Sequence, residues 1–155
     1  MEFDSTLLDT YRTLLQTTDL QRAYQEFIRL FRYLRSELER QLPDCRFQGG
    51  ISENAMDYAY FSFTTPQTKE NGLKIVVAFV HKRFQLEVWL SGVNRSIQCR
   101  WVQQLKACPP PMEATPDPAH TDYLVRLPVQ VDLSCGEAVA AAVKAAAAEL
   151  EQLLL

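Results

Sequence analysis

Seven residues in the middle of the chain combine aromatic rings, hydroxyls, a carboxylate and a guanidinium at spacings that can bring them together. They are Tyr58, Tyr60, Ser62, Glu87, Trp89, Asn94 and Arg95. The first five alternate with apolar residues along segments of β-strand character, and alternate side chains of a strand lie on one face of its sheet. If these polar sets align, the five line one concave surface and the last two lie at its rim. Aromatic walls around a few polar groups are typical of a small-molecule binding site.

Glu87 is a weak candidate for a catalytic residue. A carboxylate between aromatic side chains can serve as a general acid or base, with Asn94 or Arg95 orienting an anionic or carbonyl group. In the alternative interpretation, Glu87 pairs with Arg95 or a lysine, and the tyrosines only cover the sheet. Both interpretations fit the sequence, so whether the protein is an enzyme stays open.

The sequence lacks the residue patterns of metal sites, of catalytic nucleophiles and of phosphate-binding loops. A metal site needs more ligands than Asp57, His81 and His120 are expected to bring together. The chain has no nucleophile motif and no glycine-rich phosphate-binding motif. Its four cysteines are scattered without a CxxC pair, which favours reduced thiols over a zinc site or a disulfide framework. No metal site is predicted, and whether the protein uses a cofactor stays unknown.

The composition is that of an ordinary folded domain. Of the 155 residues, 47% are apolar and 23% are charged, a balance that favours one globular domain, residues 1–155, over disorder. A formal net charge of −3 gives no global attraction to nucleic acid, which is not expected as a partner. No apolar run approaches the roughly 18 residues of a membrane-spanning helix. The acidic start MEFDSTLLDTYRTLL differs from a secretory signal, so we expect a cytoplasmic protein without a membrane contact.

Two periodicities divide the chain into helical and extended parts. Apolar residues recur every three or four positions near both ends and after Asn94, which can cap a helix. Elsewhere they alternate with polar residues and are rich in aromatic and β-branched types. The predicted helices cover residues 5–15, 18–42, 94–105 and 134–153, and the predicted strands cover residues 47–53, 57–65, 73–80, 85–91 and 122–133. Residues 66–72 and 108–120 are expected to be loops.

This order of elements predicts an α+β fold with a mostly antiparallel sheet. The first four strands have short connections, so we expect them to form a meander over residues 47–91. A tight turn at residues 82–83 sets a register in which Phe79 faces Leu86. The last strand contains Pro128, which cannot donate a hydrogen bond, so this strand is expected to lie at a sheet edge or to bulge at that residue. The N-terminal helices, the middle helix and the C-terminal helix pack around the sheet.

Two helical surfaces have alternative interpretations. Arginines among glutamates along the first two helices indicate an ion-paired solvent face, or alternatively an anion-binding surface. The C-terminal helix repeats Val139, Val143, Ala146, Leu150 and Leu153, a seam that packs in the core or, alternatively, forms a dimer contact. A homodimer through this helix or through the edge strand is therefore one possible assembly.

The central residues also carry a resemblance to a known family. The pattern consists of Met56-Asp57, Tyr60-Phe61-Ser62-Phe63, Leu73-Lys74-Ile75, Phe79, His81, Glu87-Val88-Trp89-Leu90, Gly92, Asn94, Gln98 and Trp101. It resembles a family of bacterial proteins of similar length that carry a domain of unknown function. The resemblance covers nearly the whole chain, weakens in the proline-containing loop and the alanine-rich end, and implies no activity, cofactor or substrate.

From the residues, the leading hypothesis is a protein that binds a small ligand or a partner protein on the aromatic face of its sheet. An enzyme that uses Glu87 as a general acid or base is the first alternative. A homodimeric interaction module is the second.

Overall fold

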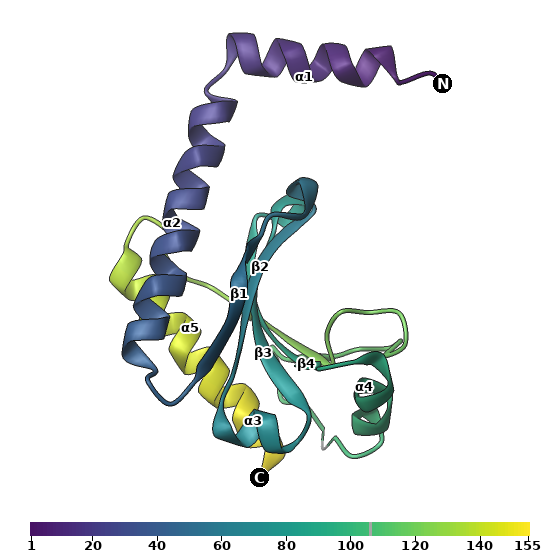
Figure 1. The fold of residues 1–155 in the computed structure, drawn as a ribbon, viewed down its shortest axis with the longest axis vertical. Helices are drawn as coiled ribbons and strands as arrows, with labels where there is room; N and C mark the ends of the chain where they lie inside the picture. Colours follow the sequence, from purple (N-terminus) through teal and green to yellow (C-terminus); the bar gives the residue numbers. More distant parts are fainter. Residues whose placement is uncertain (106) are drawn as a thin grey trace.

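The computed structural model describes residues 1–105 and 107–155 and contains helices packed with one antiparallel sheet (Figure 1). The α-helices are α1 (Ser5–Thr17), α2 (Leu20–Gln41), α3 (Pro66–Glu70), α4 (Arg95–Val102) and α5 (Gly136–Glu151). The strands are β1 (Arg46–Ser52), β2 (Tyr58–Thr64), β3 (Leu73–Val80), β4 (Gln85–Gly92), β5 (Glu113–Ala114) and β6 (Val125–Val129). Short 3₁₀ turns cover Asn54–Met56, His81–Arg83 and Gln152–Leu154. The fold class is α+β, as the sequence predicts.

The sheet is open and its strands follow the order β1-β2-β3-β4-β6-β5, with every neighbouring pair antiparallel. The first four strands form the predicted meander. Phe79 faces Leu86 and Val77 faces Val88, which is the predicted register of the β3–β4 hairpin. In β1, Gly49 adopts a positive φ of 61°, and the pairing with β2 shifts there, so this strand is bulged.

One face of the sheet carries the main core. Helices α2 and α5 lie across it (Figure 1), and apolar side chains of alternate strand positions meet them. On α2 the buried residues Ile28, Phe31, Leu34 and Leu38 recur at helical spacing. On α5 the predicted seam, including Val143, is buried in the same core. The apolar seam of α5 therefore packs within its own chain.

The opposite face of the sheet is only partly covered. Its buried residues Val76, Ala78 and Trp89 form a small separate cluster, against which Tyr58, Tyr60, Val80 and Tyr123 pack. Helix α4 and the loop before β6 lie beside this face (Figure 1). The alternation along β2, β3 and β4 thus divides each strand between a fully packed face and a face with room for a site.

Several local predictions differ from the structure. Residues 66–72 include the short helix α3, because Thr65 and Thr68 cap its start reciprocally. The expected surface loop at residues 108–120 contributes the two-residue strand β5. The last long strand, β6, is shorter than predicted and is not the outermost strand, although β5 pairs only with Val125 and Arg126. The predicted two-residue turn is a 3₁₀ turn that ends in a left-handed Phe84.

Helix α1 differs from the others because it projects from the start of α2 and has no buried residue (Figure 1). It begins after Asp4, whose side chain caps it by accepting a hydrogen bond from the Leu7 amide. No helix in the described part of the chain combines the length and the apolar character that crossing a membrane requires.

Candidate functional site

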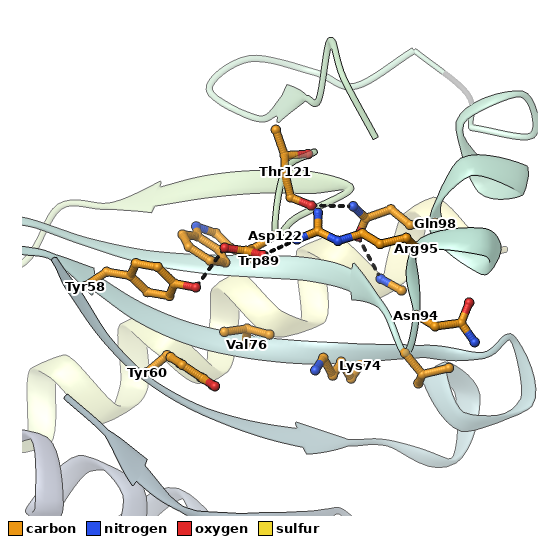
Figure 2. Close-up of a pocket in the computed structure, with 12 residues that line it drawn as sticks. Tyr58, Tyr60, Lys74, Val76, Trp89, Asn94, Arg95, Gln98, Thr121 and Asp122 are labelled. Carbon is orange, nitrogen blue, oxygen red and sulfur yellow. Dashed lines mark hydrogen bonds and ion pairs between the residues drawn. The ribbon is translucent and has the colours of Figure 1, made fainter. Parts of the chain in front are cut away.

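A hollow of about 350 Å³ lies on the open face of the sheet, beside the start of α4 (Figure 2). We call it the aromatic pocket. Its lining residues are Tyr58, Tyr60, Lys74, Val76, Trp89, Gly92, Val93, Asn94, Arg95, Gln98, Thr121 and Asp122. Five of the seven predicted binding residues are among them, namely Tyr58, Tyr60, Trp89, Asn94 and Arg95. The other two, Ser62 and Glu87, do not line the pocket.

The floor of the pocket is built by side chains on three adjacent strands. The rings of Tyr58 and Tyr60 on β2 have centroids 5.6 Å apart, and the Tyr58 ring is 5.3 Å from that of Trp89 on β4. Val76 on β3 lies between them in the sheet order. Tyr123 packs against Trp89 at 5.6 Å. Because the rings rest on paired strands and on one another, the floor is a pre-formed apolar surface.

Asp122 connects the floor to the helix at the rim. Its carboxylate accepts a hydrogen bond of 2.8 Å from the Tyr58 hydroxyl and forms an ion pair with Arg95 (Figure 2). Burial raises the pKa of the Tyr58 hydroxyl, and the hydrogen bond to Asp122 raises it further. Ser91 donates a hydrogen bond of 2.8 Å to the Asp122 carbonyl, which fixes the backbone of this loop against β4.

Gln98 fastens the same loop to α4. Its side chain is buried at 2% exposure, and its amide nitrogen donates to the carbonyls of Pro118 and Thr121 at 2.9 and 2.8 Å. Its amide oxygen accepts a hydrogen bond of 3.0 Å from the Gly92 amide. One side chain therefore joins the end of β4, the helix and the loop, and its polar groups are used in doing so.

The turn from β4 into α4 depends on a close backbone approach. A Cβ atom at Gly92 would lie 2.7 Å from the backbone oxygen of Asn94 and 2.8 Å from the backbone nitrogen of Gln98, so only glycine fits. Asn94 then caps α4, because its side-chain oxygen accepts a hydrogen bond of 2.9 Å from the Ile97 amide. The role of Asn94 as a helix cap agrees with the sequence prediction.

Two polar groups of the pocket have no partner within the described part of the chain. The Lys74 ammonium makes no ion pair or hydrogen bond there, and the Tyr60 hydroxyl makes no hydrogen bond. Lys74 extends from β3 along the floor between Tyr60 and the α4 end of the pocket (Figure 2). Both side chains are partly exposed, so water or a ligand can reach them.

Glu87 lies on the same sheet face but below the surface. It is 1% exposed, and its carboxylate accepts a hydrogen bond of 2.9 Å from the indole nitrogen of Trp89. Its second oxygen lies 3.9 Å from the Arg83 guanidinium. The carboxylate thus holds the Trp89 indole through this hydrogen bond and does not line the pocket. The geometry corresponds to the alternative in which Glu87 is paired, with Arg83 as the partner instead of Arg95 or a lysine.

Sequence reasoning missed several lining residues. Lys74 shares the alternation that places Val76 on the open face, so the period of two could have found it. Thr121 and Asp122 lie in the loop before β6, so the alternation of the strand predicted over residues 122–133 does not place them at the pocket. The place of Gln98 depends on how α4 packs beside the sheet. In the described residues, no group of three or more His, Cys, Asp or Glu side chains is placed to hold a metal ion.

The fold and the site define the class of protein. It is an α+β domain in which helices cover one face of an antiparallel sheet and the other face carries a small aromatic pocket. The chain belongs to the family DUF7000, a domain of unknown function, whose model matches residues 4–154. Comparison with curated proteins and with solved structures gives no match.

Proposed function

We propose that this protein binds a small ligand in the aromatic pocket, and that the ligand has a planar part and an anionic group. The observation that carries the proposal is the Lys74 ammonium, which lines the pocket beside Tyr60 without an acidic partner in the described chain. A cation in a polar and partly enclosed position attracts an anion more strongly than a fully solvated lysine does.

The balance of charge in the pocket supports an anionic ligand. Arg95 and Asp122 form an ion pair and offset each other, so Lys74 supplies an unbalanced positive charge. The Tyr60 hydroxyl adds a hydrogen-bond donor on the same side of the floor. A carboxylate or phosphate group can accept from both.

The shape of the floor supports a planar ligand. Tyr58, Tyr60 and Trp89 present ring surfaces and edges that bury apolar area without the loss of much side-chain freedom. A volume of about 350 Å³ is at the lower end of ligand sites, which favours a molecule of metabolite size. Binding is favoured over acid–base catalysis, because the buried Glu87 carboxylate cannot touch a molecule in the pocket and Asp122 is held by two partners.

A thermal-shift screen against a metabolite library tests the proposal. A ligand that binds the native state raises the melting temperature by mass action. We expect the stabilising compounds to be anionic, and we expect Lys74→Gln and Tyr60→Phe to weaken their effect. Lys144→Gln is the matched control, since Lys144 is an exposed lysine on α5 away from the pocket.

Two results contradict the proposal. One is a library in which no anionic compound stabilises the wild-type protein. The other is a set of stabilising compounds that act equally on the wild type and on Lys74→Gln. Isothermal titration of each hit against the three variants separates a loss of affinity from a change in protein stability.

A further inference from the structure

Helix α1 presents an apolar stripe that nothing in the described chain covers. Leu7, Tyr11 and Leu14 recur at spacings of four and three, flanked by Leu8 and Leu15, and their exposure ranges from 37% at Leu15 to 66% at Leu7. Phe3 precedes the helix and is also exposed. Monomeric proteins rarely expose contiguous apolar surface beyond a few hundred Å². An isolated helix of 13 residues is also marginally stable in water, so α1 needs a partner.

The helix is an integral part of the domain. The family model matches from residue 4, so it includes the whole of α1. The other long apolar seam, on α5, is already buried in the chain's own core. If two copies of the chain associate through a helical seam, the exposed seam of α1 is available for that contact.

The first half of α2 supplies a complementary seam. Leu20, Ala23, Phe27 and Leu30 recur at spacings of three and four, and each keeps part of its surface exposed. With a rise of 1.5 Å per residue, this seam is about 15 Å long, and the stripe from Leu7 to Leu15 is about 12 Å long. Seams of this spacing and similar length are typical of helices that pack side by side.

The charges of the two segments are opposite. Residues 1–19 hold four acidic residues and Arg12, a net charge of −3, which equals that of the whole chain. Residues 20–30, the first half of α2, hold two arginines and one glutamate, a net charge of +1. Pairing α1 with another α1 would bring two acidic segments together, whereas pairing α1 with α2 of another copy brings opposite charges together.

We propose that a second copy of this chain covers α1, with α1 of each copy lying against the first half of α2 of the other. The contact is reciprocal, as a two-fold dimer requires, and it is formed twice in each dimer. The acidic character of α1 also argues against an anionic membrane surface as its partner, because helices that lie on such surfaces carry lysine and arginine on their polar face.

Light scattering coupled to size-exclusion chromatography of the full chain tests the dimer. Leu14→Glu places a charge in the α1 stripe, and Ala23→Glu places the same charge in the α2 seam. Their matched controls are Thr13→Glu on the polar side of α1 and Gln25→Glu on the outer side of α2. All four positions are exposed, so each variant keeps its fold, which circular dichroism verifies.

We expect the wild type and both controls to have the mass of a dimer across the micromolar range, and both seam variants to have the mass of a monomer. A wild type that stays monomeric overturns the proposal. A dimer that survives Leu14→Glu overturns it as well. A dimer that is lost in Leu14→Glu but kept in Ala23→Glu overturns the reciprocal arrangement, because α1 then packs on a different surface.

Discussion

The Tyr58 hydroxyl donates a hydrogen bond of 2.8 Å to Asp122, a residue 64 positions later in the chain. The bond joins the second strand of the meander to the loop before β6, and Arg95 pairs with the same carboxylate. Strand β2, helix α4 and the loop before β6 therefore meet at Asp122 and together enclose the aromatic pocket.

Replacement of Tyr58 by phenylalanine isolates this hydrogen bond. We expect Tyr58→Phe to lower the free energy of unfolding by about 1 kcal/mol, since the bond has a charged acceptor but is partly open to water. Tyr60→Phe is the matched control, because the Tyr60 hydroxyl has no partner in the described chain, and its effect should be close to zero. Urea titration measures both. Equal decreases in the free energy of unfolding of the two variants would show that the hydrogen bond to Asp122 does not stabilise the loop.

Gln98 is expected to be the most sensitive polar residue of the site. Gln98→Leu keeps the volume but leaves the Gly92 amide and the carbonyls of Pro118 and Thr121 without their partner. We expect a loss of about 3 kcal/mol, because several backbone groups lose a hydrogen bond together. Gln103→Leu, at an exposed position at the end of α4, serves as the control. A loss below that of Tyr58→Phe would contradict the role of Gln98 as the fastener of the loop.

Substitutions of Glu87 distinguish a structural role of its carboxylate from a catalytic one. Glu87→Gln retains an acceptor for the Trp89 indole, so we expect the fold and the affinity for pocket ligands to be nearly unchanged. Glu87→Leu removes the acceptor and leaves a buried N–H unpaired, at a cost of about 1–3 kcal/mol. Tryptophan fluorescence and denaturant titration follow the two variants. A turnover that Glu87→Gln abolishes without a change in ligand affinity would instead favour the enzyme hypothesis.

His81 gives the fold a dependence on pH. Burial against Phe27 and Phe79 lowers its pKa, which Asp57 partly counteracts, and its Nε2 atom is buried without a hydrogen-bond partner in the described chain. A neutral histidine is therefore favoured in the fold. Its contribution to stability is complete above the unfolded pKa of about 6.5 and is lost as the pH falls through the lower folded pKa.

The replacement His81→Phe tests this dependence. We expect the decline in melting temperature between about pH 7 and pH 5 to be smaller in the variant than in the wild type. His120→Gln is the control, since His120 is exposed and lies beside Asp117, so its removal should leave the decline caused by His81 in place. Parallel declines in the wild type and His81→Phe would assign the pH dependence to other groups.

The sheet could be predicted from the sequence because its signal is local. Alternation in β3 and β4 distinguishes the two faces, and a short connection determines their register, as the pairing of Phe79 with Leu86 confirms. The helix cap at Asn94 is equally local. The floor of the pocket follows from the alternation and the short connections between strands, so Tyr58, Tyr60 and Trp89 could be predicted from the sequence.

The part of the pocket that the loop before β6 forms, Thr121 and Asp122, could not be predicted in this way. Asp122 reaches Tyr58 from the end of a loop that contains several prolines, whose path has no periodic signal. The predicted strand over residues 122–133 included Asp122, but β6 begins only at Val125. Glu87 shows a different limit. Alternation places it on the correct face, but its burial and its hydrogen bond from the Trp89 indole depend on three-dimensional packing.

The floor of the aromatic pocket and the loop beside it (residues 121–122) are held in different ways. The floor lies on paired strands, whereas residues 121–122 are held to the rest of the domain by the side chains of Tyr58, Ser91, Arg95 and Gln98. We expect this loop to open by local unfolding while the sheet stays intact. If the pocket binds the proposed ligand, we expect the opening rate of the loop to limit how fast that ligand leaves. Hydrogen exchange at the backbone amides of Thr121 and Trp89 would report the opening of the loop and of the sheet independently.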